Sequence, residues 1–204
     1  MEFEYSEGKI VFNRELTNLD KLVLKFCDIL HRLNIRYVII SGYITILFGR
    51  VRMTDDVDLF IEELPIERVI ELWNLLEKEG FEGVCTFTPE EAFETLNDKT
   101  SIRFALKGTW KPNFELKFPA SPSSIYSLRK KVLVILNGRE LYTSEIEMQI
   151  AYKLRMTGDK DLEDALHLYS VFKEQLDLSL LEFHMQDLGV PRERAEQLWK
   201  SGKK

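Results

Sequence analysis

The stretch SGYITILFGRVRMTDDVDLF, residues 41–60, combines a small-residue turn, a short apolar run, two arginines and three aspartates. Asp56 and Asp58 are separated by one residue, Val57, at the start of an apolar segment that is typical of a strand. Because side chains alternate between the faces of a strand, these two carboxylates share one face, and Val57 points into the core. Asp55 points the other way, and we expect it to be solvated at the strand edge.

Two carboxylates this close repel each other, so one tends to stay protonated unless a cation lies between them. A hard divalent ion such as Mg²⁺, or Mn²⁺ in its place, relieves the repulsion and prefers oxygen ligands. The alternative is that Asp56 and Asp58 face solvent at the beginning of an exposed strand. The pattern alone leaves both interpretations open.

A small-residue turn precedes the two acids. Ser41 and Gly42 end an apolar, β-branched run at 35–42, which reads as a buried strand, and they open a short helix that we expect to close at Gly49. Backbone N–H groups in a turn of this kind can bind phosphate. Arg50, Arg52 and Thr54 then lie just before the acids.

A third acid is available on a later strand. In the segment NFELKF, the side chains of Asn113, Glu115 and Lys117 share one face, and the apolar side chains share the other. If that strand lies beside the strand of Asp56 and Asp58, Glu115 joins them. Three carboxylates, a phosphate-binding turn and nearby cations favour a two-metal phosphoryl-transfer site.

The remaining chain predicts a mixed sheet followed by helices. Residues 18–33 and 64–81 have helical spacing, the first capped by Asn18 or Asp20. Short strands are expected at 10–12 and within 130–141, and a hairpin at 101–108 and 113–120. Residues 83–100 are expected to be irregular or partly helical. Helices are expected at 144–157, 160–174, 177–188 and 191–200. We therefore predict an α+β fold (an α/β mixed sheet with flanking helices), with a sheet domain at 1–143 and a C-terminal helical region at 144–204.

Composition narrows the function classes. The chain has 204 residues, a net charge of −6, and 45% hydrophobic residues. This charge argues against general duplex DNA binding. The longest apolar run, residues 37–48, is too short to cross a membrane, and the acidic N-terminus does not resemble a signal peptide. With only Cys27 and Cys85, a disulfide framework is not expected, and we predict a cytoplasmic protein.

These motifs together resemble a known family. Ser41-Gly42, then thirteen residues, then DVDLF with RMT just before it, is similar to the signature of the polymerase-beta-like nucleotidyltransferase superfamily. Residues 144–169 resemble the helical segment of minimal nucleotidyltransferases and AbiEii-type toxins, through Lys153-Leu154 and through the run from Lys160 to Asp164. The resemblance spans about residues 36–168. It departs at the turn, where the family has Gly-Ser or Gly-Gly, and at Glu115, where the family often has Asp.

The resemblance implies transfer of an NMP from an NTP to an acceptor, with release of pyrophosphate. The acceptor is a small molecule, a protein or an RNA end. Asp56, Asp58 and Glu115 would hold Mg²⁺ or Mn²⁺, with Glu115 also helping to deprotonate the acceptor. The nucleotide-binding residues would be Ser41, Gly42, Arg50, Arg52, Thr54, Lys153, Lys160, Asp161 and Asp164.

Other interpretations stay open for several of these residues. The arginines can belong to a solvated loop, Lys153 can be a solvated helix charge, and Lys160 with Asp164 can form a surface ion pair. Trp110, in a hairpin loop beside Lys111, is either a packing residue or lies over a base. The whole chain can also be a catalytically silent binding module, including a toxin–antitoxin component with a partner protein. The sequence leaves the oligomeric state open.

Overall fold

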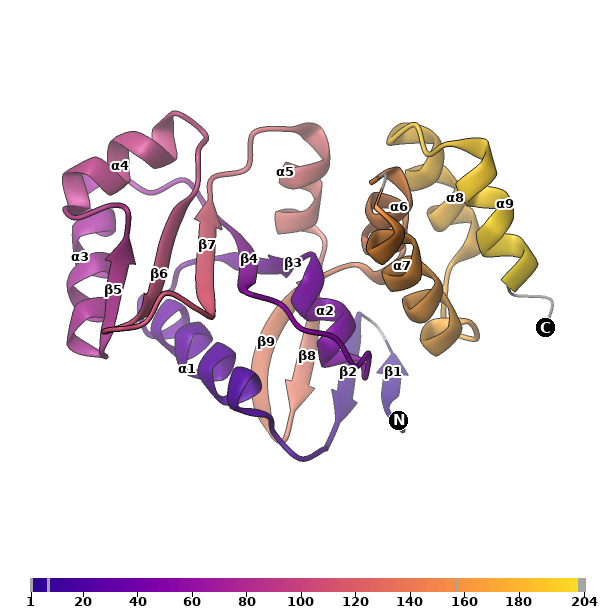
Figure 1. Ribbon diagram of the computed structural model, residues 1–204, viewed down its shortest axis with the longest axis horizontal. Coiled ribbons are helices and arrows are strands. Elements are labelled where there is room, and N and C mark those ends of the chain that lie inside the picture. Colours follow the sequence, from indigo (N-terminus) through magenta and orange to yellow (C-terminus); the bar gives the residue numbers. More distant parts are fainter. Residues whose placement is uncertain (1, 7, 157, 202–204) are drawn as a thin grey trace.

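The computed structural model describes residues 2–6, 8–156 and 158–201 (Figure 1). Within these residues, strands form one mixed sheet in the order β1-β2-β8-β9-β3-β4-β7-β6-β5. The strands are β1 (Glu4–Ser6), β2 (Lys9–Phe12), β3 (Tyr37–Ile40), β4 (Asp56–Ile61), β5 (Phe81–Val84), β6 (Ile102–Leu106), β7 (Asn113–Lys117), β8 (Lys131–Leu136) and β9 (Arg139–Ser144).

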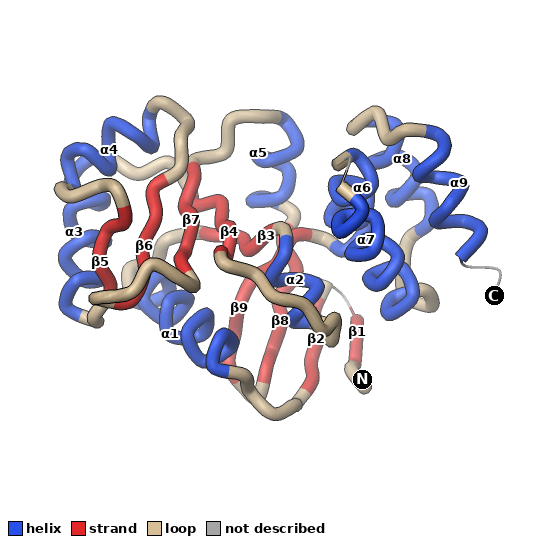
Figure 2. The backbone as a smooth tube through the Cα atoms, viewed as in Figure 1, coloured by secondary structure: helices blue, strands red, loops and turns tan. Residues whose placement is uncertain are grey.

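Helices flank the sheet and follow it. They are α1 (Asn18–Arg32), α2 (Gly42–Leu47), α3 (Ile66–Lys78), α4 (Pro89–Asn97), α5 (Pro122–Arg129), α6 (Ile146–Arg155), α7 (Asp159–Phe172), α8 (Leu178–Asp187) and α9 (Arg192–Ser201). Figure 2 shows α6 to α9 gathered at one end of the molecule, with α3 and α4 at the other. The predicted mixed sheet with flanking helices and a helical C-terminal region is confirmed.

Aromatic packing between α1 and the sheet shows which face of the sheet is covered by this helix. The ring of Phe26 on α1 stacks on Phe114 of β7, with 4.0 Å between the centroids, and Phe81 meets both rings edge-on. Because alternate side chains of β7 point to opposite faces, Glu115 lies on the face away from α1. The apolar half of the NFELKF pattern is therefore the half that holds the sheet to its helices.

One local expectation needs correction, one is borne out, and one helix was missed. The helix α1 is capped by Thr17, not by Asn18 or Asp20: the Thr17 hydroxyl accepts the Asp20 N–H, and the Asp20 carboxylate accepts the Thr17 N–H in return, a reciprocal capping box. Residues 83–100, expected to be irregular or partly helical, are partly helical: they contain the end of β5 and the helix α4. The helix α5 was not expected at all, because its serine-rich sequence after Pro122 reads as a loop.

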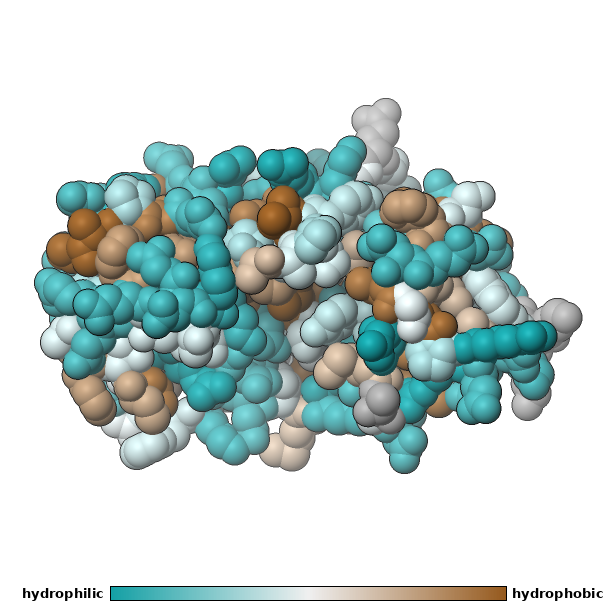
Figure 3. All heavy atoms as spheres, turned by 90° about the horizontal axis from the view of Figure 1, so that it is seen from above, coloured by the Kyte–Doolittle hydropathy of each residue, from teal (hydrophilic) through white to brown (hydrophobic). Residues whose placement is uncertain are grey.

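The face seen from above is largely polar. Hydrophilic residues cover most of this face, with separate hydrophobic patches between them (Figure 3). In the part of the chain that the structure describes, no helix has both the length and the apolar character needed to span a membrane.

Candidate active site

The two aspartates and the glutamate lie on adjacent strands. The strands β4 and β7 pair in parallel, with Asp58 opposite Glu115 and Asp56 opposite Asn113. On the other side of β4, Ile40 of β3 is the partner of Asp58. Residues in register across a sheet share a face, so the three carboxylates lie on the face away from α1.

Crowding of these carboxylates changes the chemistry of Asp58. Burial, followed by the negative charges of Asp56 and Glu115, raises the pKa of Asp58 to about 6, against a partly compensating hydrogen bond from Ser41. Ser41 directly follows Ile40, the β3 partner of Asp58, so the small-residue turn begins beside the acid pair. A side chain whose charge is disfavoured by its neighbours is a natural cation ligand.

Glu115 is held differently from the aspartates. Its carboxylate accepts hydrogen bonds from Arg103 on β6, with 2.7 Å between Nη2 and Oε2, and pairs with Lys117, with 2.5 Å between Nζ and Oε1. Burial alone would raise the pKa of Glu115, but Lys117 and Arg103 hold it below its usual range. Neither Arg103 nor Lys117 was predicted to contact the acids.

The chemistry of the donors bears on whether a metal fits here. Asp56 and Asp58 offer hard carboxylate oxygens on one face. Burial, followed by the charges of Asp56 and Glu115, raises the pKa of Asp58, and a divalent cation would favour its charged form. Among the described residues, no three Asp, Glu, His or Cys side chains are grouped so as to hold a metal ion. The two aspartates nevertheless offer the oxygen donors that Mg²⁺ prefers, whereas both Glu115 oxygens are engaged by Arg103 and Lys117.

The turn before α2 contains a strained backbone conformation at Ser41, and hydrogen bonds from α6 stabilise it. Ser41 has φ 64°, a left-handed conformation that a residue with a Cβ adopts at a cost. Gln149 of α6 satisfies both of its backbone groups: the Ser41 N–H donates to Gln149 Oε1 at 3.2 Å, and Gln149 Nε2 donates to the Ser41 carbonyl at 3.1 Å. Sequence reasoning missed Gln149, because a glutamine within a helical segment carries no signal of such a contact.

Gly42 allows a close approach at the same turn. A Cβ on Gly42 would lie 2.7 Å from Nη2 of Arg52 and 3.3 Å from Oγ1 of Thr54. The Thr54 hydroxyl lies 3.0 Å from the Asp56 carbonyl oxygen and 3.1 Å from its carboxylate. The absence of a side chain at Gly42 thus lets the Arg52 guanidinium lie against the turn beside the acids.

Both arginines are bound to a buried carboxylate of α7. Asp164 is completely buried and pairs with Arg50 and Arg52. It also pairs with Lys153 of α6, with 3.0 Å between Nζ and Oδ2, and accepts a hydrogen bond from the Thr45 hydroxyl at 3.2 Å. These contacts tie the loop before β4 to α2, α6 and α7.

The surrounding charges complete this cluster. Arg50 also pairs with the exposed Glu163, and Lys153 pairs with Asp161 at 2.7 Å. Lys160 lies at the edge, with its ammonium 3.5 Å from the Met53 carbonyl oxygen. Lys153 is buried rather than solvated, and Asp164 is not part of a surface ion pair.

Asp55 lies apart from the acid pair. It is exposed, as expected for the aspartate on the opposite face, and it pairs with Lys111 in the loop between β6 and β7.

The fold has known counterparts. The sequence matches no protein-family model and no curated protein. Among solved structures, an antigenic nucleotidyltransferase-like protein from Paracoccidioides brasiliensis is 22% identical over 89% of this chain and 91% of that chain, with a TM-score of 0.55. The lincomycin-bound lincosamide antibiotic adenylyltransferase LnuA is 12% identical over 78% of this chain and 99% of that chain, with a TM-score of 0.51.

A third structure, the antibiotic-resistance factor ANT(2'')-Ia, is 16% identical over 92% of this chain and 99% of that chain, with a TM-score of 0.55. None of these three proteins is described as an AbiEii-type toxin, so that narrower resemblance stays a prediction. At these identities the likeness concerns the fold, and this chain has the fold of the nucleotidyltransferases.

Proposed function

We propose that the protein is a metal-dependent nucleotidyltransferase, which transfers an NMP from an NTP to an acceptor and releases pyrophosphate. The observation that carries this proposal is the position of Asp56 and Asp58 on one strand face, with Ile40, the residue before the Ser41-Gly42 turn, in register with Asp58. In a nucleotidyltransferase fold, this arrangement would place a phosphate-binding turn beside a metal-ligand pair, which supports the proposal.

Each group has a proposed role. Asp56 and Asp58 would hold Mg²⁺ or Mn²⁺, which when bound neutralises charge that develops on the phosphates. Ser41 and Gly42 would contact the β- and γ-phosphates. An acceptor hydroxyl loses its proton to solvent while its oxygen forms a bond to the α-phosphorus, the bond from that phosphorus to the α–β bridging oxygen breaks, and pyrophosphate leaves. The pKa of Glu115 is lowered, which makes it a poor base for removing a proton from the acceptor. Its role in this proposal is therefore to contribute negative charge beside the aspartates.

The arginines are not equivalent in this proposal. Arg52 lies against Gly42, and it is the better candidate for a bidentate triphosphate contact. Arg50 points to Glu163, Asp164 and the Lys160 carbonyl, and we propose that it fixes the loop. Lys153 and Asp161 would act from the helical region, and Asp164 would position the cations rather than touch nucleotide.

The first acceptors to test are small molecules. One structurally similar protein is named as a lincosamide antibiotic adenylyltransferase, so ATP and lincosamides come first, followed by the other NTPs, RNA ends and protein acceptors. The assay uses an NTP labelled at the α-phosphate and follows both labelled product and pyrophosphate. We expect transfer that requires Mg²⁺ or Mn²⁺ and falls by at least about 100-fold in Asp56→Asn and in Asp58→Asn.

The neighbouring aspartate provides the control. Asp55→Asn removes the same charge one residue away on the opposite face, where it pairs only with exposed Lys111, and should keep its activity. Equal transfer by Asp58→Asn and the unaltered protein would contradict the proposal.

A catalytically silent nucleotidyltransferase-like module is the second candidate. The observation that favours it is the engagement of Glu115 by Arg103 and Lys117, which keeps a third acid away from the metal pair. Such a module, including a toxin–antitoxin component with a partner protein, predicts no transfer to any acceptor.

A further inference from the structure

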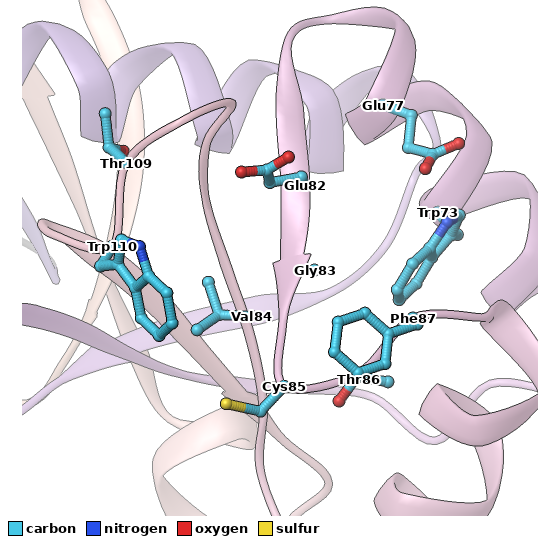
Figure 4. Close-up of a pocket in the computed structure, with 10 residues that line it drawn as sticks. All are labelled: Trp73, Glu77, Glu82, Gly83, Val84, Cys85, Thr86, Phe87, Thr109 and Trp110. Carbon is cyan, nitrogen blue, oxygen red and sulfur yellow. The ribbon is translucent and has the colours of Figure 1, made fainter.

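A cavity of about 380 Å³ lies at the β5 edge of the sheet, apart from the acid pair. Figure 4 shows β5 between its walls, with the ring of Trp110 on one side and the rings of Trp73 and Phe87 on the other. Val84 lies between these walls, and Glu77 and Glu82 lie toward one end. The cavity thus has aromatic sides and two carboxylates.

The aromatic walls combine one fixed ring and two exposed rings. Trp73 is buried, packs edge-on against Phe104 at 5.0 Å, and lies so close to Gly83 that a Cβ there would be 2.5 Å from the indole. Phe87 and Trp110 are 77% and 75% exposed. Large aromatic side chains exposed together around a cavity mark a binding site more often than single exposed apolar residues do.

The charge of the lining decides the kind of ligand. The charged side chains that line the cavity are Glu77 and Glu82. Glu82 is fixed in place, because its Oε1 accepts the Gly108 N–H at 2.8 Å. Arg103 is opposite Val84 on β6, but it is bound to Glu115 and does not line the cavity. Nucleotides also stack on aromatic rings, but their phosphates would be repelled here.

We propose that this cavity binds an organic cation, a protonated amine or quaternary ammonium group on an apolar frame. Aromatic faces attract cations through their quadrupoles, and the two carboxylates add a charge of the right sign. Along the sheet, Val84, Arg103, Glu115 and Asp58 are in register across four strands. At a strand spacing of about 4.8 Å, Val84 is roughly 14 Å from Asp58, so the cavity is separate from the reacting centre.

The test is calorimetric titration with benzyltrimethylammonium at low ionic strength, without NTP or metal, so that its result does not depend on the proposed transfer reaction. We expect saturable one-site binding, and much weaker binding of neopentylbenzene, the neutral molecule of the same shape. Trp110→Ala and Phe87→Ala should each weaken binding by about 2- to 30-fold, the range of a desolvated cation–aromatic contact.

Matched variants separate charge from structure. Glu82→Gln keeps an oxygen that can accept the Gly108 N–H but removes the charge, and it should also weaken binding. Glu94→Gln makes the same change at an exposed position of α4 outside the cavity, and it should bind like the unaltered protein. Equal affinity for the cation and the neutral molecule, or affinity unchanged by both Trp110→Ala and Glu82→Gln, would overturn the proposal.

Discussion

Asp58 should titrate near pH 6 in the metal-free protein, because burial and the charges of Asp56 and Glu115 raise its pKa from 3.8. A folded-state pKa above the unfolded value means that protonation of Asp58 stabilises the fold. That stabilisation is complete below about pH 4 and is lost as the pH rises through about 6. Urea unfolding across this range should show the loss in the unaltered protein and a smaller loss in Asp58→Asn, leaving the variant more stable by roughly 1–3 kcal/mol at neutral pH.

NMR of the side-chain carboxyl carbons measures the pKa of Asp58 directly. Replacing Asp56 by Asn should lower the Asp58 pKa, whereas Asp55→Asn should leave it in place, since Asp55 is exposed and paired with Lys111. An Asp58 resonance that titrates at the ordinary aspartate pKa would show that the carboxylates do not crowd one another.

The alternation of side chains along a strand predicted the positions of the acids in this site, but the contacts of the arginines could not be predicted. The shared face of Asp56 and Asp58, and Glu115 on the polar face of its strand, follow from a period of two residues. The partners of Arg50 and Arg52 do not follow from any local pattern, because Asp164 lies more than a hundred residues further along the chain. A sequence shows that arginines are near a phosphate turn, but it does not show which anion holds them.

At the scale of elements, α6 acts on the turn before α2. Gln149→Ala removes the partner of both Ser41 backbone groups and of the Ser144 hydroxyl. Each buried polar group left without a partner costs about 1–3 kcal/mol, so we expect a loss of roughly 2–4 kcal/mol in the free energy of unfolding. Chemical denaturation measures this loss, and transfer activity should fall with it because Ser41 is no longer fixed.

The exposed Gln186 on α8 is the matched position. Gln186→Ala should change stability by less than about 0.5 kcal/mol. If Gln149→Ala were as stable as Gln186→Ala, the left-handed Ser41 turn would not depend on α6.

Helices with a strong apolar periodicity were predicted correctly. The start of α1 and the presence of α5 were not, because both depend on hydrogen bonds of capping residues. The helix α1 has a clear apolar stripe, but its true cap, Thr17, lies just outside the stripe and is recognised only through its reciprocal bonds with Asp20. The helix α5 depends on a similar serine capping box at Ser121 and buries little apolar surface. Its short, polar sequence is indistinguishable from a loop by hydrophobic pattern alone.

At the scale of the whole molecule, Asp164 joins the sheet to the C-terminal helices. Asp164→Asn would leave Arg50, Arg52 and Lys153 without their shared buried anion, and breaking a buried charge cluster in this way costs about 3–5 kcal/mol. We expect this loss in denaturant unfolding, with faster amide hydrogen exchange in α6 and α7.

Glu163→Gln is the control for Asp164→Asn. Glu163 pairs with Arg50 from the adjacent position, but its side chain is 66% exposed, so its removal should cost less than about 1 kcal/mol. Equal effects of the two variants would contradict an anchoring role for Asp164.

The sheet order lies beyond what the sequence predicts. Strand β2 pairs with β8 more than a hundred residues later, and β3 pairs in parallel with β9. Such pairings are set by how helices and strands pack together, not by local propensity. The division of the chain into a sheet domain at 1–143 and a helical region at 144–204 stays a prediction, and limited proteolysis tests it.

Metal-dependent nucleotide binding tests the central claim most directly, because it needs no acceptor. The measurement is calorimetric titration with the α,β-methylene analogue of each NTP, with and without Mg²⁺. We predict that at least one analogue binds only with Mg²⁺, that Asp55→Asn binds it equally well, and that the double variant Asp56→Asn with Asp58→Asn binds it at least about tenfold more weakly. Failure of every analogue to bind in a Mg²⁺-dependent way, or equal binding by the double variant, would contradict the proposed nucleotidyltransferase site.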